Sequence, residues 1–324
     1  MKRDKKHIYI YSPSGAVRDK AAFRRGVARL TALGYEVEVD TAALSSHQRF
    51  AGDDATRLAA IDRACDSGAD IALISRGGYG LTRILPGIHY KKVTKAIGQG
   101  TQFVGISDFT AFQNALLAKT GACSWAGPGL CEGFGMSSYL DKKTGAPALQ
   151  PDAVMEACFH DLLTGQGQGA GWRLPRLDGT NTTPKGSQAW QVGDAVLWGG
   201  NLSVFTGLLG TPYFPDVRGG ILFLEDVAEH PYRIERMLTQ LLYAGVLQRQ
   251  KAVLLGQFTG YQTVAHDRGF RLQSVVDWLR QQIPGPVLTG LPYGHVTKKV
   301  LLPVGAKTDL IVQNREAWLL WGHG

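Results

Sequence analysis

The regular alternation of short apolar strands with helical patterns in the first half of the chain constrains the fold most. Apolar runs at 7–11, 69–75 and 102–106 predict strands, and helical spacing of apolar residues at 20–33 and 53–67 predicts helices between them. Strands separated by helices in this way pair in parallel, with the helices covering the sheet. The first half therefore predicts a parallel sheet with flanking helices.

The amino-acid composition changes after the first half of the chain. Between residues 139 and 184 Gly, Pro, Gln and Thr become frequent, and short strand patterns resume beyond it. A length of 324 residues fits about two domains. We predict an α/β protein with an N-terminal flavodoxin- or Rossmann-like parallel-sheet domain over 1–140. Linker and exposed loops follow over 141–184, and a mixed α/β domain covers 185–324.

The charge pattern gives little support to a nucleic-acid-binding protein. The chain has 35 Lys and Arg against 27 Asp and Glu, a net charge of +8. Apart from the run at residues 2–6, these cations are dispersed, and no RNP-like or helix-turn-helix signature is found. A solvated basic surface is the simpler interpretation, although a basic protein also suits an acidic small substrate.

Cysteine spacing and hydropathy exclude further classes. The four cysteines form no Cys-x-x-Cys pair and have no histidine at zinc-ligand spacing, so we predict buried free thiols and neither metal nor cofactor. No apolar run reaches the roughly 18 residues that span a membrane. The apolar stretch at 8–11 is too short for a signal-peptide core. We therefore expect a cytoplasmic protein, or a periplasmic one if a leader has been removed.

Ser107 is the first candidate for chemistry. It stands in Gly105-Ile-Ser-Asp-Phe-Thr110, between the strand at 102–106 and a predicted helix at 109–119. Such a turn exposes the serine Oγ and surrounds it with backbone N–H groups. It resembles the nucleophile elbow Gly-x-Ser-x-Gly, although Phe109 replaces the second glycine. A plain helix N-cap is the alternative interpretation.

A glycine-rich segment, Ser75-Arg-Gly-Gly-Tyr-Gly80, follows the strand at 69–75. Glycines let the backbone approach a ligand closely and direct its N–H groups toward it. The segment matches neither Gly-x-Gly-x-x-Gly nor a P-loop, so nucleotide binding is weakly supported. An oxyanion donor and a simple tight turn remain as interpretations.

Glu225 and His295 form the third candidate. Glu225 ends an apolar run at 221–224, where a buried carboxylate needs a partner. His295 follows Gly294 and has the most turn-like setting of the eight histidines, whereas His7 and others in polar stretches are predicted at the surface. A nucleophilic serine needs a base, and the base needs an acceptor that fixes its tautomer. Ser107, His295 and Glu225 can fill these three roles.

Taken in order, motifs along nearly the whole chain resemble the serine L,D-carboxypeptidases, the murein-tetrapeptide family that includes the microcin-immunity peptidases. The motifs are Ser12-Pro-Ser-Gly15, Arg49-Phe-Ala-Gly-Asp53, Arg76-Gly-Gly-Tyr-Gly80, Gly105-Ile-Ser-Asp-Phe-Thr110, Trp198-Gly-Gly-Asn-Leu202, Leu209-Gly-Thr-Pro212, Phe223-Leu-Glu-Asp226, Pro231-Tyr-Arg-Ile-Glu-Arg236, Gly294-His295 and Leu302-Pro-Val-Gly305. The ordered series, rather than any one motif, carries the resemblance.

This resemblance implies a Ser-Glu-His triad. Ser107 would be the nucleophile, His295 the general base and Glu225 its orienting carboxylate, with the backbone N–H groups of Gly78 and Asp108 as the oxyanion hole. Since Ser107 falls in the first predicted domain and the other two triad residues in the second, the site is expected between the domains.

The resemblance also implies the substrate. Family members cleave the L,D-amide that joins the third residue of a murein tetrapeptide to a terminal D-Ala, without a metal or other cofactor. Arg76, Tyr79 and Asn201 are then candidates for substrate binding. Which acid of the Glu225-Asp226 pair orients the histidine stays open, although the motif favours Glu225. A muropeptide is the expected partner, and homodimers are common in the family, which leaves a homodimer open here.

Two alternatives remain. A microcin-immunity-type enzyme would hydrolyse peptidyl- or aminoacyl-nucleotide conjugates with the same triad. An aromatic ring in the segment 165–200 would favour it, and Trp190 is the candidate. A non-catalytic muropeptide- or nucleotide-binding protein is the second alternative, because a fold alone does not fix a function.

Overall fold

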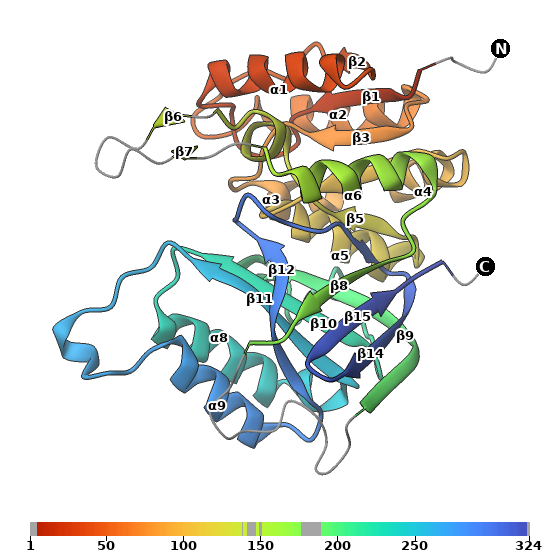
Figure 1. Cartoon of the computed structure of the whole chain (residues 1–324). Coiled ribbons are helices and arrows are strands. Elements are labelled where there is room, and N and C mark those ends of the chain that lie inside the picture. The colour runs from red at the N-terminus through yellow and green to blue at the C-terminus, as the bar shows by residue number, and fades with distance from the viewer. Residues whose placement is uncertain (1–4, 138, 141–146, 149–150, 176–188, 323–324) are drawn as a thin grey trace. The chain divides into compact units, whose positions relative to one another are not determined.

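The chain divides into two compact units, shown in the computed structural model of Figure 1. The structure describes residues 5–137, 139–140, 147–148, 151–175 and 189–322. Unit 1 comprises Met1–Gly167 with Thr297–Leu302, and unit 2 comprises Gln168–Val296 with Pro303–Gly324. Each unit is described by itself.

A six-stranded sheet forms the centre of unit 1, in the order β13-β5-β4-β3-β1-β2. The pairs β1–β2, β1–β3, β3–β4 and β4–β5 are parallel, which confirms the predicted parallel sheet. All five residues of β1 are buried, as expected for an inner strand covered on both faces. The strands are β1 His7–Tyr11, β2 Glu36–Val39, β3 Ile71–Ile74, β4 Gln102–Gly105, β5 Ser124–Ala126 and β13 Leu302–Val304.

His7 is an exception to the surface prediction for the polar-stretch histidines. It is the first residue of β1 and only 1% exposed. Its neighbours in sequence are basic, but β1 pairs with a strand on each side, and this inner position buries the imidazole. Of the four cysteines predicted to be buried, Cys65 and Cys131 are buried, whereas Cys123 and Cys158 are partly exposed. Burial raises the pKa of the Cys65 and Cys131 thiols to about 12.

Three helices of unit 1, α1, α2 and α6, begin where an aspartate supplies a cap. The carboxylates of Asp19, Asp53 and Asp152 accept backbone N–H groups in the first turns of these helices, which satisfies donors that a helix leaves unpaired. The helices are α1 Lys20–Ala32, α2 Asp54–Asp66, α3 Leu81–Ile84, α4 Tyr90–Gly98, α5 Phe109–Thr120 and α6 Ala153–Thr164. A small antiparallel pair, β6 Tyr139–Leu140 with β7 Pro147–Ala148, precedes α6.

Two distant segments belong to unit 1 because their apolar side chains lie in its core. Phe159 of α6 is fully buried and its ring meets that of Phe134 edge-on, with centroids 4.9 Å apart. Leu301 of the returning segment joins the same cluster. The contacts therefore divide the predicted 141–184 linker. Helix α6 joins unit 1, β8 (Gly169–Arg173) joins unit 2, and residues 176–188 lie outside the described residues.

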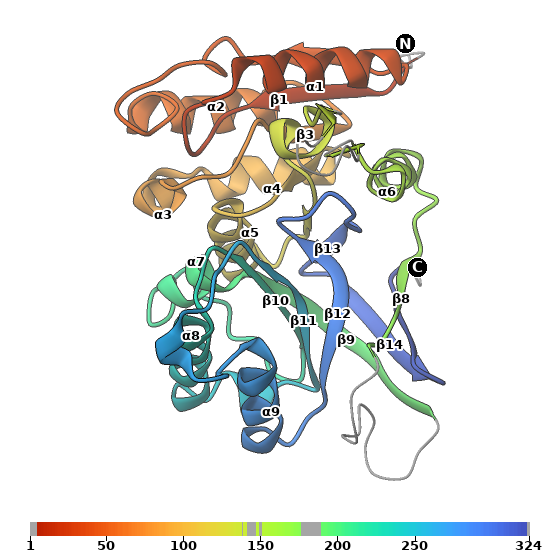
Figure 2. The same cartoon turned by 60° about the vertical axis from the view of Figure 1, so that its left-hand side comes forward.

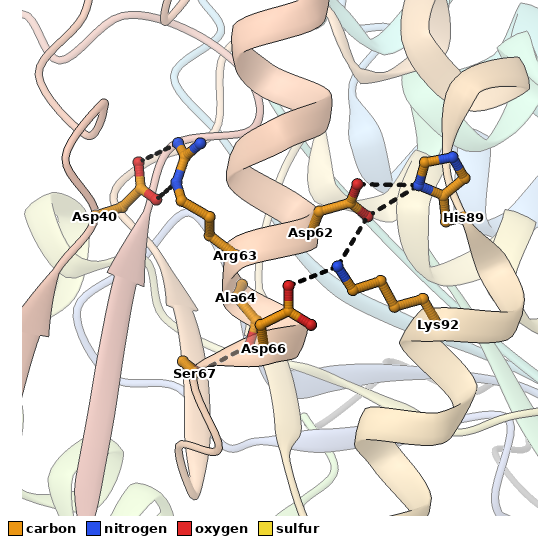
Figure 3. Close-up of polar contacts among 8 residues, drawn as sticks. All are labelled: Asp40, Asp62, Arg63, Ala64, Asp66, Ser67, His89 and Lys92. Atoms are coloured by element: carbon orange, nitrogen blue, oxygen red, sulfur yellow. Dashed lines mark hydrogen bonds and ion pairs between the residues drawn. The ribbon is translucent and has the colours of Figure 1, made fainter.

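Polar contacts tie α2 to its neighbours in unit 1 (Figure 3). Arg63 donates from Nε and Nη2 to the two carboxylate oxygens of Asp40, which follows β2, at 2.7 and 2.9 Å. On another side of the helix, Asp62 lies 3.0 Å from His89 Nδ1, and Lys92 of α4 pairs with Asp66 at 2.6 Å. The Asp40 carboxylate is buried, whereas His89 is mostly exposed.

Unit 2 has a seven-stranded mixed sheet in the order β12-β11-β10-β9-β14-β15-β8. The strands β9 to β12 are parallel, and β14, β15 and β8 continue the sheet antiparallel. The long β9 serves both parts, since its first half pairs with β14 and its last residues, Leu197–Asn201, pair with β10. Its strands are β8 Gly169–Arg173, β9 Ala189–Asn201, β10 Ile221–Val227, β11 Ala252–Thr259, β12 Val287–Gly294, β14 Lys307–Gln313 and β15 Glu316–Leu320.

The helices of unit 2 are α7 Leu202–Gly207, α8 Pro231–Tyr243 and α9 Leu272–Gln282. Helices α8 and α9 lie side by side next to the parallel strands (Figure 2). Because β9, β10, β11 and β12 are parallel, their carboxyl ends lie at one edge of the sheet, where the residues that follow them can meet. In the part of the chain that the structure describes, no helix is long and apolar enough to cross a membrane.

Candidate active site

Ser107 sits on a strained turn in unit 1, as the sequence predicts. It lies between β4 and α5 and takes φ +65°, a left-handed conformation that few residues other than glycine adopt. The N–H of Thr110 donates to the Ser107 carbonyl at 2.9 Å, which closes the turn into the helix. Gly105 is required beside Phe109, because a Cβ at Gly105 would lie 2.5 Å from that ring. A serine held in this way is typical of a nucleophile elbow.

The glycine segment after β3 packs directly against this turn. A Cβ built on Gly77 would lie 2.5 Å from the Cβ of Ser107 and 2.8 Å from its Oγ. Gly78 takes φ +120°, a conformation that strains any residue with a side chain. Both predicted oxyanion donors, the N–H groups of Gly78 and Asp108, thus belong to segments that meet at Ser107.

Two candidate substrate-binding residues flank the same segment. Arg76 is half-buried; its Nη1 lies 3.4 Å from the Ala16 carbonyl and its Nε 3.4 Å from a Glu132 carboxylate oxygen. It lines a pocket of about 380 Å³ together with Arg18 and Arg25. Tyr79 is 48% exposed. This exposure leaves an aromatic face that a peptide could contact.

In unit 2 the structure brings Glu225 and His295 together. Glu225 lies near the end of β10 and is fully buried, while His295 directly follows β12. The Nδ1 of His295 lies 2.8 Å from Glu225 Oε2. Gly294 between strand and histidine takes φ +143°, and a Cβ there would come within 3.2 Å of the same carboxylate oxygen. Both the glycine and the bonded carboxylate fix the imidazole.

Asp226, the other acid of the pair, has different partners. It accepts from the N–H and Oγ of Ser203 at 2.9 and 2.6 Å and from the Val227 N–H at 2.8 Å. Burial raises the pKa of its carboxyl, and the charge of Glu225 adds to this, although the hydrogen bonds oppose it. The geometry therefore favours Glu225 as the acid that orients the histidine.

Asn201, predicted to bind substrate, contacts both acids. Its Nδ2 donates to Glu225 Oε1 at 3.1 Å and to Asp226 Oδ1 at 2.9 Å, and its Oδ1 caps α7. These bonds come from the end of β9, next to β10, so the amide supports the carboxylate that holds His295. Sequence reasoning missed this link and the role of Ser203, although Asn201 stands in one of the motifs that carry the resemblance.

The arrangement in unit 2 prepares a histidine for proton transfer. A carboxylate that accepts the Nδ1–H fixes the tautomer in which Nε2 can take a proton, and stabilises the imidazolium that results. Among the residues that the structure describes, no three His, Cys, Asp or Glu side chains are grouped to hold a metal ion.

The aromatic candidate of the middle segment lies in a strand. Trp190 belongs to β9 and pairs with Val312 of β14 in the antiparallel part of the sheet. The residues immediately before β9, 176–188, lie outside the described residues.

Comparisons with known proteins show the family of the chain. Residues 8–127 match the family model described as LD-carboxypeptidase N-terminal domain, and residues 194–310 match LD-carboxypeptidase C-terminal domain. The murein tetrapeptide carboxypeptidase of Pseudomonas aeruginosa is 30% identical over 294 residues, which cover 88% of this chain and 85% of the relative.

Two further relatives are a structure of the same family and an immunity protein. The crystal structure of muramoyltetrapeptide carboxypeptidase from Oxalobacter formigenes superimposes with a TM-score of 0.81 at 36% identity, over 98% of this chain and 99% of that chain. The microcin C7 self-immunity protein of Escherichia coli is 26% identical over 249 residues, 74% of this chain and 70% of the relative. The chain belongs to the LD-carboxypeptidase family, because it matches both domain models and is 36% identical to a solved member over 98% of its length.

Proposed function

We propose that the protein is a serine peptidase that releases the terminal D-Ala of murein tetrapeptides by cleaving an L,D-amide bond. The observation that carries the proposal is the 2.8 Å contact of His295 Nδ1 with the buried Glu225 carboxylate, in a family member whose Ser107 occupies a left-handed turn. A buried carboxylate, a bonded histidine and a strained serine are the three parts of a serine-hydrolase triad.

Chain connectivity supports a triad formed from both units. His295 precedes Thr297 by two residues, and at Thr297 the chain returns to unit 1, which contains Ser107. The base and the segment that returns to unit 1 are therefore neighbours along the chain. The returning segment ends at Leu302, which is the first residue of β13.

The mechanism follows from these roles. His295 Nε2 takes the Ser107 proton as Oγ attacks the scissile carbonyl, and Glu225 stabilises the imidazolium. The N–H groups of Gly78 and Asp108 hold the oxyanion, each such donor contributing about 3–4 kcal/mol. When the tetrahedral intermediate collapses, His295 returns the proton to the amine of D-Ala, which leaves. Water, deprotonated by the same histidine, then hydrolyses the acyl-enzyme.

Two of the proposed substrate contacts, Arg76 and Tyr79, belong to the glycine segment that packs against Ser107. Arg76 carries a cation next to the glycine segment, where it can pair with a substrate carboxylate, and the exposed ring of Tyr79 can pack on the peptide. Asn201 remains a candidate for substrate contact as well as a support for Glu225.

The test is release of D-Ala from L-Ala-γ-D-Glu-meso-diaminopimelate-D-Ala, followed by mass spectrometry, with Ser107→Ala beside the native protein. We expect loss of one D-Ala with the native protein only. Release by both proteins would show that Ser107 is misassigned. Release by neither, from folded protein, would contradict this substrate. Labelling of Ser107 by a serine-directed phosphonate separates an enzyme from a binding protein, because a protein that only binds does not react.

The same assay with an aminoacyl-nucleotide conjugate addresses the microcin-immunity alternative, which the similarity to the Escherichia coli self-immunity protein keeps under consideration. Hydrolysis of the conjugate in preference to the tetrapeptide would favour that activity. A cytoplasmic location and a homodimer also stay predictions; cell fractionation and sedimentation of the native protein test them.

A further inference from the structure

One buried carboxylate links the nucleophile turn to the glycine segment within unit 1. The Asp108 side chain follows Ser107 directly and is 1% exposed. Its Oδ2 accepts the hydroxyl of Ser14 at 2.5 Å and the backbone N–H of Leu81 at 2.8 Å. One oxygen atom therefore joins three segments: the loop after β1, the end of the glycine segment and the turn before α5.

The glycine segment is fixed at both ends by other bonds. The Gly15 N–H donates to the Gly77 carbonyl at 3.2 Å. At the other end, Arg57 Nη1 donates to the Gly80 carbonyl at 2.8 Å, and this arginine is itself fully buried. Between these two ends lies Gly78, whose φ of +120° would strain any residue with a side chain.

The two predicted oxyanion donors therefore lie on different segments, and the Asp108 carboxylate bridges them. One donor is the backbone N–H of Asp108 itself, and the other is the N–H of Gly78, three residues before Leu81. A displacement of about 1 Å in such a pair can cost 10²-fold in rate. An oxyanion hole acts through donors that are in place before the reaction. The distance between the two N–H groups therefore matters, and the bonds of the Asp108 carboxylate hold that distance.

We infer that the side chain of Asp108 is a positioning residue, which with Ser14 sets the spacing of the two oxyanion donors on either side of Ser107. The inference rests on the proposed function, since it needs Ser107 as the nucleophile. It assigns a role to the Ser12-Pro-Ser-Gly15 motif and to a carboxylate that the triad mechanism does not use.

The variants Asp108→Ala and Asp108→Asn test it, because neither removes a backbone N–H. Alanine deletes the bridging oxygen, and we expect kcat for D-Ala release to fall roughly 10–100-fold with KM within about twofold of native. Asparagine keeps an oxygen in place of Oδ2 that can accept both bonds, and it should restore kcat to within about threefold. A role in folding alone would lower thermal stability without this kcat loss and rescue.

Tyr9→Phe is the matched control. Tyr9 is 3% exposed and its hydroxyl donates to Asp40 Oδ2 at 2.6 Å, so its loss also removes a buried hydrogen bond to a carboxylate of unit 1. None of the bonds described above for the glycine segment and the nucleophile turn involves Tyr9, and kcat of this variant should equal native. Should Asp108→Ala fail to fold, Ser14→Ala removes only one bond of the bridge and should lower kcat by roughly 3–10-fold.

Three results would overturn the inference: a folded Asp108→Ala with native kcat, an Asp108→Asn as impaired as the alanine variant, or an equal loss in Tyr9→Phe. If the native protein releases no D-Ala, the proposed function fails separately. The phosphonate labelling rate of Ser107 across the same variants then decides the inference, because the adduct places an oxygen in the same hole. Native protein that also resists labelling would overturn both.

Discussion

At the residue scale, the position of Ser107 depends on the absence of a side chain at Gly77. The backbone of Gly77 is not left-handed, so the need for glycine there comes from space alone. A Cβ at Gly77 would lie 2.5 Å from the Ser107 Cβ, so Gly77→Ala must displace the serine or the glycine segment. We expect this variant to lose roughly 10²-fold in kcat for D-Ala release, because the reacting Oγ moves by a large fraction of an ångström. Steady-state kinetics and phosphonate labelling measure the effect.

Gly98→Ala provides the control at the same scale. Gly98 ends α4, and a Cβ there would meet nothing within 4 Å. We expect native activity and a gain of about 0.4–1 kcal/mol in the free energy of unfolding, since alanine restricts the unfolded chain. Equal loss of activity in both glycine variants would contradict the role given to the Gly77–Ser107 contact.

At the element scale, an ion pair with a fully buried carboxylate joins Arg63 of α2 to Asp40, which follows β2. Burial alone would raise the pKa of the Asp40 carboxyl, but the hydrogen bonds from Arg63, Tyr9 and the Ala42 N–H outweigh burial and lower it. With a folded pKa below the unfolded value, the ionised carboxylate stabilises the fold above about pH 4. That stabilisation is lost as the pH falls through the folded pKa.

Asp40→Asn should therefore cost about 1–3 kcal/mol at pH 7, below the usual cost of breaking a buried pair because Arg63 is 39% exposed. The difference from native should shrink as the pH falls below about 4. Urea unfolding at pH 7, 5 and 3.5 measures it. Asp62→Asn, on the same helix and facing the exposed His89, should cost less than about 0.5 kcal/mol (Figure 3). A constant difference at all three pH values would contradict the assignment to Asp40.

The elements were more predictable than the contacts between distant residues. The parallel sheet of unit 1 and the helices that start at Asp19 and Asp53 follow from periodicity and capping, which are local signals. The burial of His7 does not, because it depends on strands that pair on both sides of β1. The bond of Asn201 to Glu225 and the bridge of Ser14 to Asp108 join residues 24 and 94 positions apart, and no local pattern encodes them.

At the scale of the whole molecule, the chain passes between the units at three places: after Gly167, after Val296 and after Leu302. The second crossing follows the general base at once. Whether a short segment belongs to one unit or the other depends on what its side chains pack against. The sequence does not show this packing, so it could not show that Thr297–Leu302 returns to unit 1. The domain boundary predicted at residue 185 therefore gives no sign of this second crossing.

The crossing after Val296 leads to a prediction for the whole molecule. Insertion of two glycines between Val296 and Thr297 lengthens the connection from His295 to unit 1 by about 7 Å of extended chain, without altering a triad residue. We expect kcat to fall at least roughly 100-fold, because the base loses its fixed place relative to the nucleophile. The same insertion between Gly167 and Gln168, a crossing that carries no triad residue, should change kcat by less than about threefold, and thermal melting should show both proteins folded. If both insertions lower kcat equally, the loss does not come from the length of the connection after His295, and the role given to this crossing is wrong.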